Sequence, residues 1–400
     1  MKRMILVFWG LWAMSACAFA QVSEDFQAAF TEARALVWTE PDQALAQLKV
    51  ITQTYDLPKA GRWYAEVEFA FGLAYYQKDF YELAKERFNA VLATPYGQTS
   101  DEMKINIYNN LGVVNDLTRN YSQALESYQK ALEIEERRDR PVEMAEIYSN
   151  ISLIYYNLSQ PQDGLDALDR AWDLVKDEPE MGLIHGLIYQ NRAINHYDLA
   201  EFDEFRAANE SAIEIYDAIG QYPRRLQITY NLIRDAILRT QDVSLAETLL
   251  ARGEQLAKVH QVRIMEPYFL LQRGELALLQ DQAAAAREYF DQSQKAFAEL
   301  GIEGQSLPDD LYQGLMAAHA RLGEADAVME TLAEFRQAIV DREMATQRAS
   351  VNQLKTQLEF NEQANELQQK TIELQGQQAR AQRLAFVTIL LLILLLAGLA

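Results

Sequence analysis

The stretch Asn106–Leu132, NIYNNLGVVNDLTRNYSQALESYQKAL, has the pattern of two amphipathic helices joined by a tight turn. In its first half, Leu111, Gly112 and Asn115 lie on one helical face. In its second half, large and small apolar residues recur at helical spacing: Tyr121, Ala124, Tyr128 and Ala131. Gly112 is small where two helices have to approach closely, and Tyr128 is large enough to fill the remaining space. The stretch therefore predicts a helix-turn-helix unit.

The unit recurs along the chain at an almost constant interval. Aligning the copies on the small position of the first helix gives the series Gly72, Gly112, Ser152, Ala193, Arg234, Gly274 and Met316. The steps in this series are 40, 40, 41, 41, 40 and 42 residues. A fixed period of this size is typical of solenoids, in which each repeat packs only on its neighbours.

The Leu111-Gly112 pair, followed by Tyr121, Ala124 and Tyr128, resembles the tetratricopeptide repeat (TPR). The resemblance covers about Ser23 to Ala338 and implies an all-α fold, a TPR-like α-solenoid of about eight helix-turn-helix repeats. Because the period exceeds the usual 34 residues, we expect longer helices or turns. We assign residues 21–338 to this solenoid.

The resemblance also implies a concave groove lined by the first helix of each repeat. Two residues before the small position stand three amides, Asn110, Asn150 and Asn191. Six residues further along each helix stand Asp116, Tyr156 and Tyr197. In peptide-binding TPR proteins the matching Asn bonds the backbone of an extended peptide, because an amide offers both a donor and an acceptor. We expect these six residues to contact a peptide or protein ligand; the alternative is that the amides bond the neighbouring helix and bind nothing.

The sequence carries no sign of catalysis, a metal or a cofactor. Its histidines, His185, His196, His260 and His319, are far apart, and none pairs closely with another His or with Cys. TPR proteins that clamp a terminal carboxylate place Lys or Arg beside the Asn, and neither Arg192 nor Arg234 fits that pattern. The formal net charge of −21 argues against nucleic acid as a partner. We expect a non-catalytic binding protein.

Residues 1–20 have the features of a secretory signal peptide. Lys2 and Arg3 precede a short apolar core, and Ala18-Phe19-Ala20 fits a cleavage site before Gln21. An alternative is that Cys17 is the lipidated first residue of a lipoprotein. Either reading predicts export.

After the repeats, residues 339–383 are rich in Gln, Glu and Ala. Apolar residues recur there every seven positions, first at Met344, Val351 and Leu358 and then, after a change of phase, at Phe360, Leu367 and Leu374. We interpret this segment as a coiled coil that forms a homodimer; a single solvated helix is the alternative. Residues 384–400, LAFVTILLLILLLAGLA, have the composition of a transmembrane helix.

This order resembles a group of bacterial membrane sensors: signal peptide, periplasmic TPR array, coiled coil and one membrane helix. In that group a cytoplasmic diguanylate cyclase, histidine kinase or LuxR-type domain follows, which here would lie beyond Ala400. The resemblance implies a single-pass inner-membrane protein whose periplasmic repeats bind a protein or peptide and relay binding through the coiled coil. The alternative is a membrane-anchored TPR scaffold for envelope protein complexes.

Overall fold

The computed structural model describes residues 24–178 and 181–348, together with Val351, Lys355, Gln377 and Arg380. Helices and turns make up these residues, and no strand occurs among them. The predicted signal peptide (1–20), the predicted membrane helix (384–400) and most of the predicted coiled coil lie outside the described residues. Among the helices that the structure does describe, none combines the length and the apolar composition that crossing a bilayer requires.

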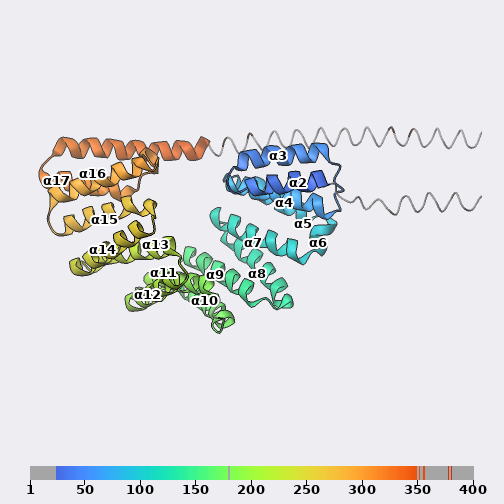
Figure 1. Ribbon diagram of the computed structural model, residues 1–400, viewed down its shortest axis with the longest axis horizontal. Helices are drawn as coiled ribbons and strands as arrows, with labels where there is room; N and C mark the ends of the chain where they lie inside the picture. The colour runs from blue at the N-terminus through green and yellow to red at the C-terminus, as the bar shows by residue number, and fades with distance from the viewer. Residues whose placement is uncertain are drawn as a thin grey trace, which may run out of the picture. The chain divides into compact units, whose positions relative to one another are not determined.

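The helices follow one another along the chain as shown in Figure 1. Their bounds are α2 Glu24–Leu36, α3 Pro41–Thr54, α4 Arg62–Gln77, α5 Tyr81–Leu92, α6 Pro95–Thr99, α7 Asp101–Leu117, α8 Tyr121–Arg138, α9 Pro141–Asn157, α10 Pro161–Val175, α11 Gly182–Asp198, α12 Phe202–Ala218, α13 Tyr222–Arg234, α14 Val243–Val259, α15 Glu266–Leu279, α16 Ala283–Glu299 and α17 Asp309–Leu322. A π-helical turn, Asp235–Arg239, extends α13, and short 3₁₀ turns occupy Arg263–Met265 and Gly304–Ser306. Residues 325–348 form a last helix.

These helices form eight antiparallel pairs in the described part of the chain, which confirms the predicted TPR-like α-solenoid. The first pair is α2 with α3 and the last is α17 with the helix that begins at residue 325. Each helix packs on the next one in sequence. First helices of successive repeats also touch: α9 contacts α11, and α15 contacts both α13 and α17. The sequence analysis did not predict α6, a one-turn helix inserted between α5 and α7.

The turn between the two helices of a repeat contains a left-handed residue in seven of the eight described pairs, all but the first. Its left-handed residue stands seven positions after the small position of the first helix: Asp79, Arg119, Ser159, Ala200, Gln241, Asp281 and Gly323. In six of these seven turns the next amide bonds a carbonyl five residues back, as Asn120 N does to Asn115 O at 2.7 Å. This bond satisfies a carbonyl at the helix end that has no helical partner. The spacing of the turn residues reproduces the 40- to 42-residue period, so the predicted repeat register is confirmed.

The small position of the first helix and a large residue of the second helix are matched in size. A Cβ atom added to Gly72, Gly112 or Gly274 would stand 2.4–2.5 Å from the ring of Phe88, Tyr128 or Phe290 respectively. Each of these rings stands sixteen residues after its glycine. Where the small position is not glycine, the residue sixteen further on is not aromatic: the pairs are Ser152 with Leu168, Ala193 with Asn209, Arg234 with Leu250 and Met316 with Leu332. In these seven repeats, an aromatic ring at this position of the second helix occurs where the small position of the first helix is glycine.

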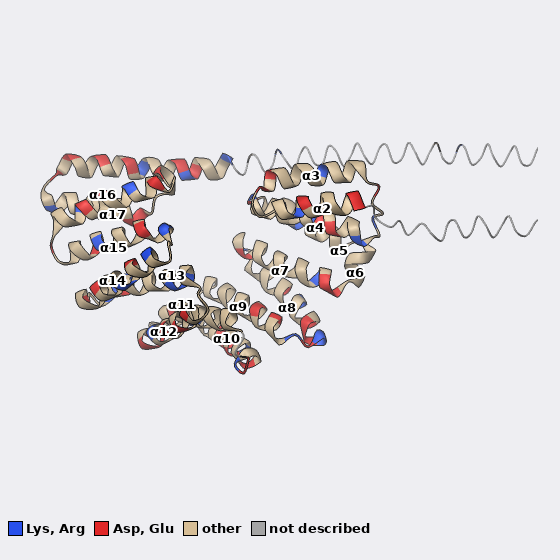
Figure 2. Cartoon of the chain, in the orientation of Figure 1, with Lys and Arg blue, Asp and Glu red and all other residues tan. Residues whose placement is uncertain are grey.

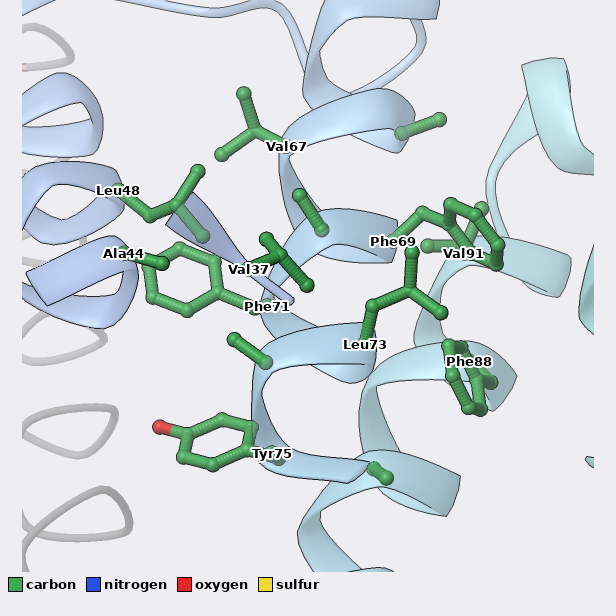
Figure 3. Packing of buried hydrophobic residues seen from close by; sticks show 14 of the residues in the cluster. Val37, Ala44, Leu48, Val67, Phe69, Phe71, Leu73, Tyr75, Phe88 and Val91 are labelled. Atoms are coloured by element: carbon green, nitrogen blue, oxygen red, sulfur yellow. The ribbon is translucent and has the colours of Figure 1, made fainter. Parts of the chain in front are cut away.

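The buried side chains form clusters shared by neighbouring repeats. Figure 3 shows one cluster, in which Leu48 of α3 lies beside Phe71 of α4 and Phe88 of α5 packs against Phe69 of α4, with ring centroids 5.5 Å apart. The repeats make one compact unit that ends at Ala338, which is 3% exposed. Residues from Ile339 belong to a second unit, in which Val340, Met344 and Val351 are exposed apolar side chains.

The fifth first helix departs from the others at its end. In the π-helical turn Asp235–Arg239, Thr240 N bonds Asp235 O at 3.1 Å, five residues back. Asp242 N then bonds Ala236 O, six residues back, where the other repeats have a five-residue bond. The hydrogen bonds here span one residue more than in an α-helix, and this alters the direction of the side chains beyond the π turn.

Replacing Gly112 by Ala should destabilise the protein by about 1 to 3 kcal/mol, because the added methyl group overlaps the buried ring of Tyr128. The measurement is the urea midpoint of unfolding for Gly112→Ala, Tyr128→Leu and the double variant. The double variant imitates the Ser152 and Leu168 pair, so its loss should be well below the sum of the two single losses. Additive losses would contradict the size matching.

The left-handed turns allow a second test with a matched pair of variants. Nothing lies within 4 Å of a Cβ atom added to Gly323, which has φ of +75°, so Gly323→Ala should cost on the order of 1 kcal/mol through backbone strain alone. Ala200, at the same position of another repeat, has φ of +58°, and Ala200→Gly should raise stability. Thermal unfolding of both variants checks this; a change of the same sign in the two would show that the turns are not equivalent.

Candidate functional site

The three predicted amides lie at equivalent positions of α7, α9 and α11, but their surroundings differ. Asn110 donates from Nδ2 to Asn106 O of its own helix at 2.7 Å. Asn150 is half-buried, and its side chain forms no hydrogen bond with the residues that the structure describes. Asn191 is 6% exposed and donates to Ser149 O of α9 at 3.2 Å. The arrangement of Asn191 is the alternative raised from the sequence, a bond to the neighbouring helix; ligand binding by the three amides stays a prediction.

The second set of predicted residues lies one to two turns further along the same helices. Asp116 accepts a hydrogen bond from Asn157 Nδ2 of α9 at 2.9 Å, so it links two successive first helices. Burial raises the pKa of the Asp116 carboxyl, and the bond from Asn157 partly offsets this. Tyr156 is half-buried. Tyr197 is 46% exposed and packs edge-on against Phe205 of α12, with ring centroids 5.2 Å apart.

Amides at this position of the repeat hold successive first helices together. Gln272 of α15 stands at the position of Asn191, is fully buried, and donates to Tyr230 O of α13 at 2.7 Å. Asn191 makes the corresponding bond from α11 to α9. A polar side chain buried between two helices needs such a partner. The first helices therefore form a layer that is joined by side-chain bonds to backbone carbonyls.

A pocket opens in this layer at the last three first helices. It has a volume of about 620 Å³ and is lined from α13 and the π turn, from α15 and from α17. Its polar lining includes Arg234, Glu275, Asp310, Gln313 and Arg321. Its apolar lining includes Leu238, Leu278 and Ala317. A concave site with a few convergent polar groups is the usual form of a binding site.

The charges in the pocket are not fully paired. Arg234 and Asp310 form an ion pair, with Nη2 and Oδ2 3.1 Å apart. Arg321 bonds Leu278 O and lies 3.3 Å from Asp281 Oδ1. Glu275 Oε2 is shielded from solvent and accepts no hydrogen bond from the residues that the structure describes. Burial raises the pKa of the Glu275 carboxyl to about 7, Arg234 acts in the opposite direction, and Asp310 adds to the rise.

This pocket was not expected from the sequence. Its one visible signal was Arg234, which occupies a position that is small in five of the seven aligned repeats. The π turn leaves no mark in the residue pattern, because the left-handed residue Gln241 stands seven positions after Arg234, the same spacing as in the other repeats. Arg192, the other cation considered, pairs with Asp169 Oδ1 at 2.6 Å and lies outside the pocket lining.

Two of the histidines have glutamate partners close to them in sequence. His196 and His319 bond Glu201 and Glu324 at 2.7 and 2.6 Å. Within the described residues, no group of three or more His, Cys, Asp or Glu side chains is placed to hold a metal ion. Figure 2 shows acidic residues distributed over many helices of the repeats, in keeping with the net charge of −21.

Asn191→Ala should lower the free energy of unfolding by about 0.5 to 1.5 kcal/mol, because it removes the buried bond to Ser149 O. Asn150→Ala is the matched control at the same position of the preceding repeat, and it should leave stability within about 0.5 kcal/mol of the parent. Urea unfolding of both variants measures this. Equal losses in the two would show that the bond between the helices does not distinguish Asn191.

Comparison with known proteins supports the fold. No family model matches the chain. Photosystem I assembly protein Ycf3 from Prochlorococcus marinus (strain MIT 9303) is 29% identical over 104 residues, which are 26% of this chain and 58% of Ycf3. The chain thus spans little more than half the length of the curated relatives that it matches.

Solved structures match over more of the chain. Aspartyl phosphate phosphatase F from Bacillus subtilis superposes with a TM-score of 0.55 at 14% identity, covering 82% of this chain and 87% of the phosphatase. A Rap protein complexed with Competence and Sporulation Factor gives 0.50 at 18% identity, covering 83% and 94%. A signal-transduction ATPase with a tetratricopeptide repeat sensor from Pyrococcus horikoshii gives 0.55 at 15% identity, covering 69% and 42%. Together with the eight helix pairs, these likenesses identify the fold as a TPR-like α-solenoid.

Proposed function

We propose that the repeats bind a protein or peptide partner on the layer formed by their first helices, as the sensory region of a single-pass membrane signalling protein. The observation that carries this proposal is the pocket between α13, α15 and α17, with the incompletely paired Glu275 inside it. Charged and apolar groups meet there on one concave surface, as binding of a side chain requires. No catalytic role is part of the proposal.

The similar proteins support partner binding by analogy. The Rap structure was solved in complex with Competence and Sporulation Factor, and the repeats of the Pyrococcus ATPase are described as a sensor. Ycf3 is described as an assembly protein. That description favours a second candidate function, a membrane-anchored scaffold that assembles envelope complexes without relaying a signal.

The membrane and relay parts of the proposal rest on the sequence. Residues 1–20 have the pattern of an export signal, and residues 384–400 that of a membrane helix. In the second unit Val340, Met344 and Val351 are exposed, and an apolar stripe on a helix is buried when two copies associate. We propose that the repeats are periplasmic, that the protein sits in a bacterial inner membrane, and that a homodimer forms through residues 339–383.

Photo-crosslinking from defined positions tests the binding surface. A photoreactive amino acid at Asn150 of α9 or Gln313 of α17 should give a crosslinked partner in the native membrane. Matched controls at Glu133 of α8 and Glu210 of α12, which are exposed on second helices, should give several-fold less product. Equal yields from the two layers would contradict the proposed surface.

The relay is distinguished from the scaffold by locking the second unit. A cysteine introduced at Met344, an exposed position of the predicted coiled-coil seam, should form a disulfide between two copies if the dimer exists. In a relay, oxidation should change the output of the intact protein whether or not the partner is present. If the disulfide forms and the output of the intact protein does not change, the scaffold is the better account.

A further inference from the structure

The pocket is built by three first helices with α15 in the middle. Arg234 belongs to α13 and Asp310 to α17, so their ion pair at 3.1 Å reaches across α15. Glu275 lies on α15 and lines the same pocket. Arg234 therefore stands near two carboxylates, one in each of the other two helices, and lowers the pKa of Glu275 while it pairs with Asp310.

The pocket has two carboxylates but one cation that acts on them both. Glu275 and Asp310 supply two carboxylates, and Arg234 is the one cation that acts on both. Arg321, the other cation in the lining, is held by Leu278 O and by Asp281 outside the pocket lining. A buried charge is stabilised when it is paired and hydrogen-bonded. One additional cationic group beside Glu275 would complete the pairing.

The walls of the pocket fit a long side chain that carries such a group. Leu238, which belongs to the π turn, is 57% exposed and lines the pocket, as do Leu278 and Ala317. An aliphatic stem can bury apolar surface against these residues while its charged end reaches the carboxylates. Gln313 adds an amide to the polar side of the lining.

We propose that this pocket binds a single basic side chain, arginine or lysine, of the protein partner, with its charged end on Glu275 and its stem along Leu238 and Leu278. The proposal rests on the proposed function, since the side chain belongs to the partner that the first-helix layer binds. It makes Glu275 the residue that selects for a cation and Arg234 the residue that holds Asp310 beside it.

The electrostatics of the free pocket agree with this assignment. Burial raises the pKa of Glu275 to about 7, so the carboxyl is about half protonated in neutral solution, and a bound cation would favour its ionised form. The other titratable groups that act on Glu275 or line the same pocket are Arg234 and Tyr230 of α13 and Asp310 and Arg321 of α17. The pKa of Tyr230 is itself raised to about 12 by burial, so this phenol stays neutral. Binding should therefore release a proton and tighten as the pH rises through 7.

The test uses capped pentapeptides on the full-length protein in detergent or lipid nanodiscs. One peptide carries arginine in an alanine background, and its partner carries citrulline, which has the same shape without the charge. Binding is followed by NMR or calorimetry at about pH 6 and about pH 8. We expect the arginine peptide to bind at least tenfold more tightly than the citrulline peptide at pH 8, and about tenfold more tightly at pH 8 than at pH 6.

The variants assign the preference to one residue. Glu275→Gln keeps the shape of the side chain and should abolish both the arginine preference and the pH dependence. Glu299→Gln, at an exposed position of α16, should change neither. An arginine peptide that fails to bind, binds no better than its citrulline counterpart, or keeps its preference in Glu275→Gln would overturn the proposal.

Two controls separate this inference from the general function and from misfolding. If the arginine preference is absent but the partner still crosslinks to the first-helix layer, only this inference fails. If the arginine preference is present but crosslinking is not specific to that layer, the proposed function fails instead.

A carboxyl whose pKa is raised on folding lowers stability once the pH exceeds its unfolded pKa. Glu275→Gln should therefore raise the thermal midpoint at pH 8 and not at pH 5, which also shows that the variant folds.

Discussion

The close approach of the two helices inside each repeat is the constraint on which the structure depends. A glycine of the first helix lies directly under an aromatic ring of the second in three repeats, as Gly112 lies under Tyr128. Tyr128 is almost fully buried there, and the turn between α7 and α8 contains Arg119 in the left-handed conformation. Because the left-handed turn recurs every 40 to 42 residues, the first helices of successive repeats stack into one layer.

Residue pattern was sufficient to predict the helix pairs and their register. The small positions that define the period, such as Gly72 and Gly274, are the residues that meet the rings of Phe88 and Phe290. Side-chain direction was harder to predict, because an amide at a fixed position of the repeat has two uses. Asn191 is turned into the layer and bonds Ser149 O, whereas Asn150 at the equivalent position makes no such bond among the described residues. A sequence contains no signal that separates these two cases.

The pocket arises where the repeat departs from its own pattern. Arg234 stands where the sequence pattern has a small residue in most repeats, and a π turn replaces the α-helical turn that follows it. These two changes place a cation and an exposed leucine on the surface of the first-helix layer, above a glutamate that lacks a hydrogen-bond partner among the described residues. A regular solenoid provides a surface, and a local irregularity in it provides the chemical selectivity. Stability is lost at such a site, because Glu275 is held where its charge is disfavoured.

The measurement that tests the account most directly is a crosslink across α15. Cysteines introduced at Arg234 and Asp310 replace an ion pair 3.1 Å long, in a chain whose single native cysteine, Cys17, lies far away in sequence. A short bis-reactive reagent should join them within one chain, as shown by peptide mapping, and should block the pocket. The pair Arg234→Cys and Asp309→Cys, shifted by one residue, should crosslink much less. Preferential crosslinking of the shifted pair would contradict the stacking of α13, α15 and α17 and, with it, the pocket.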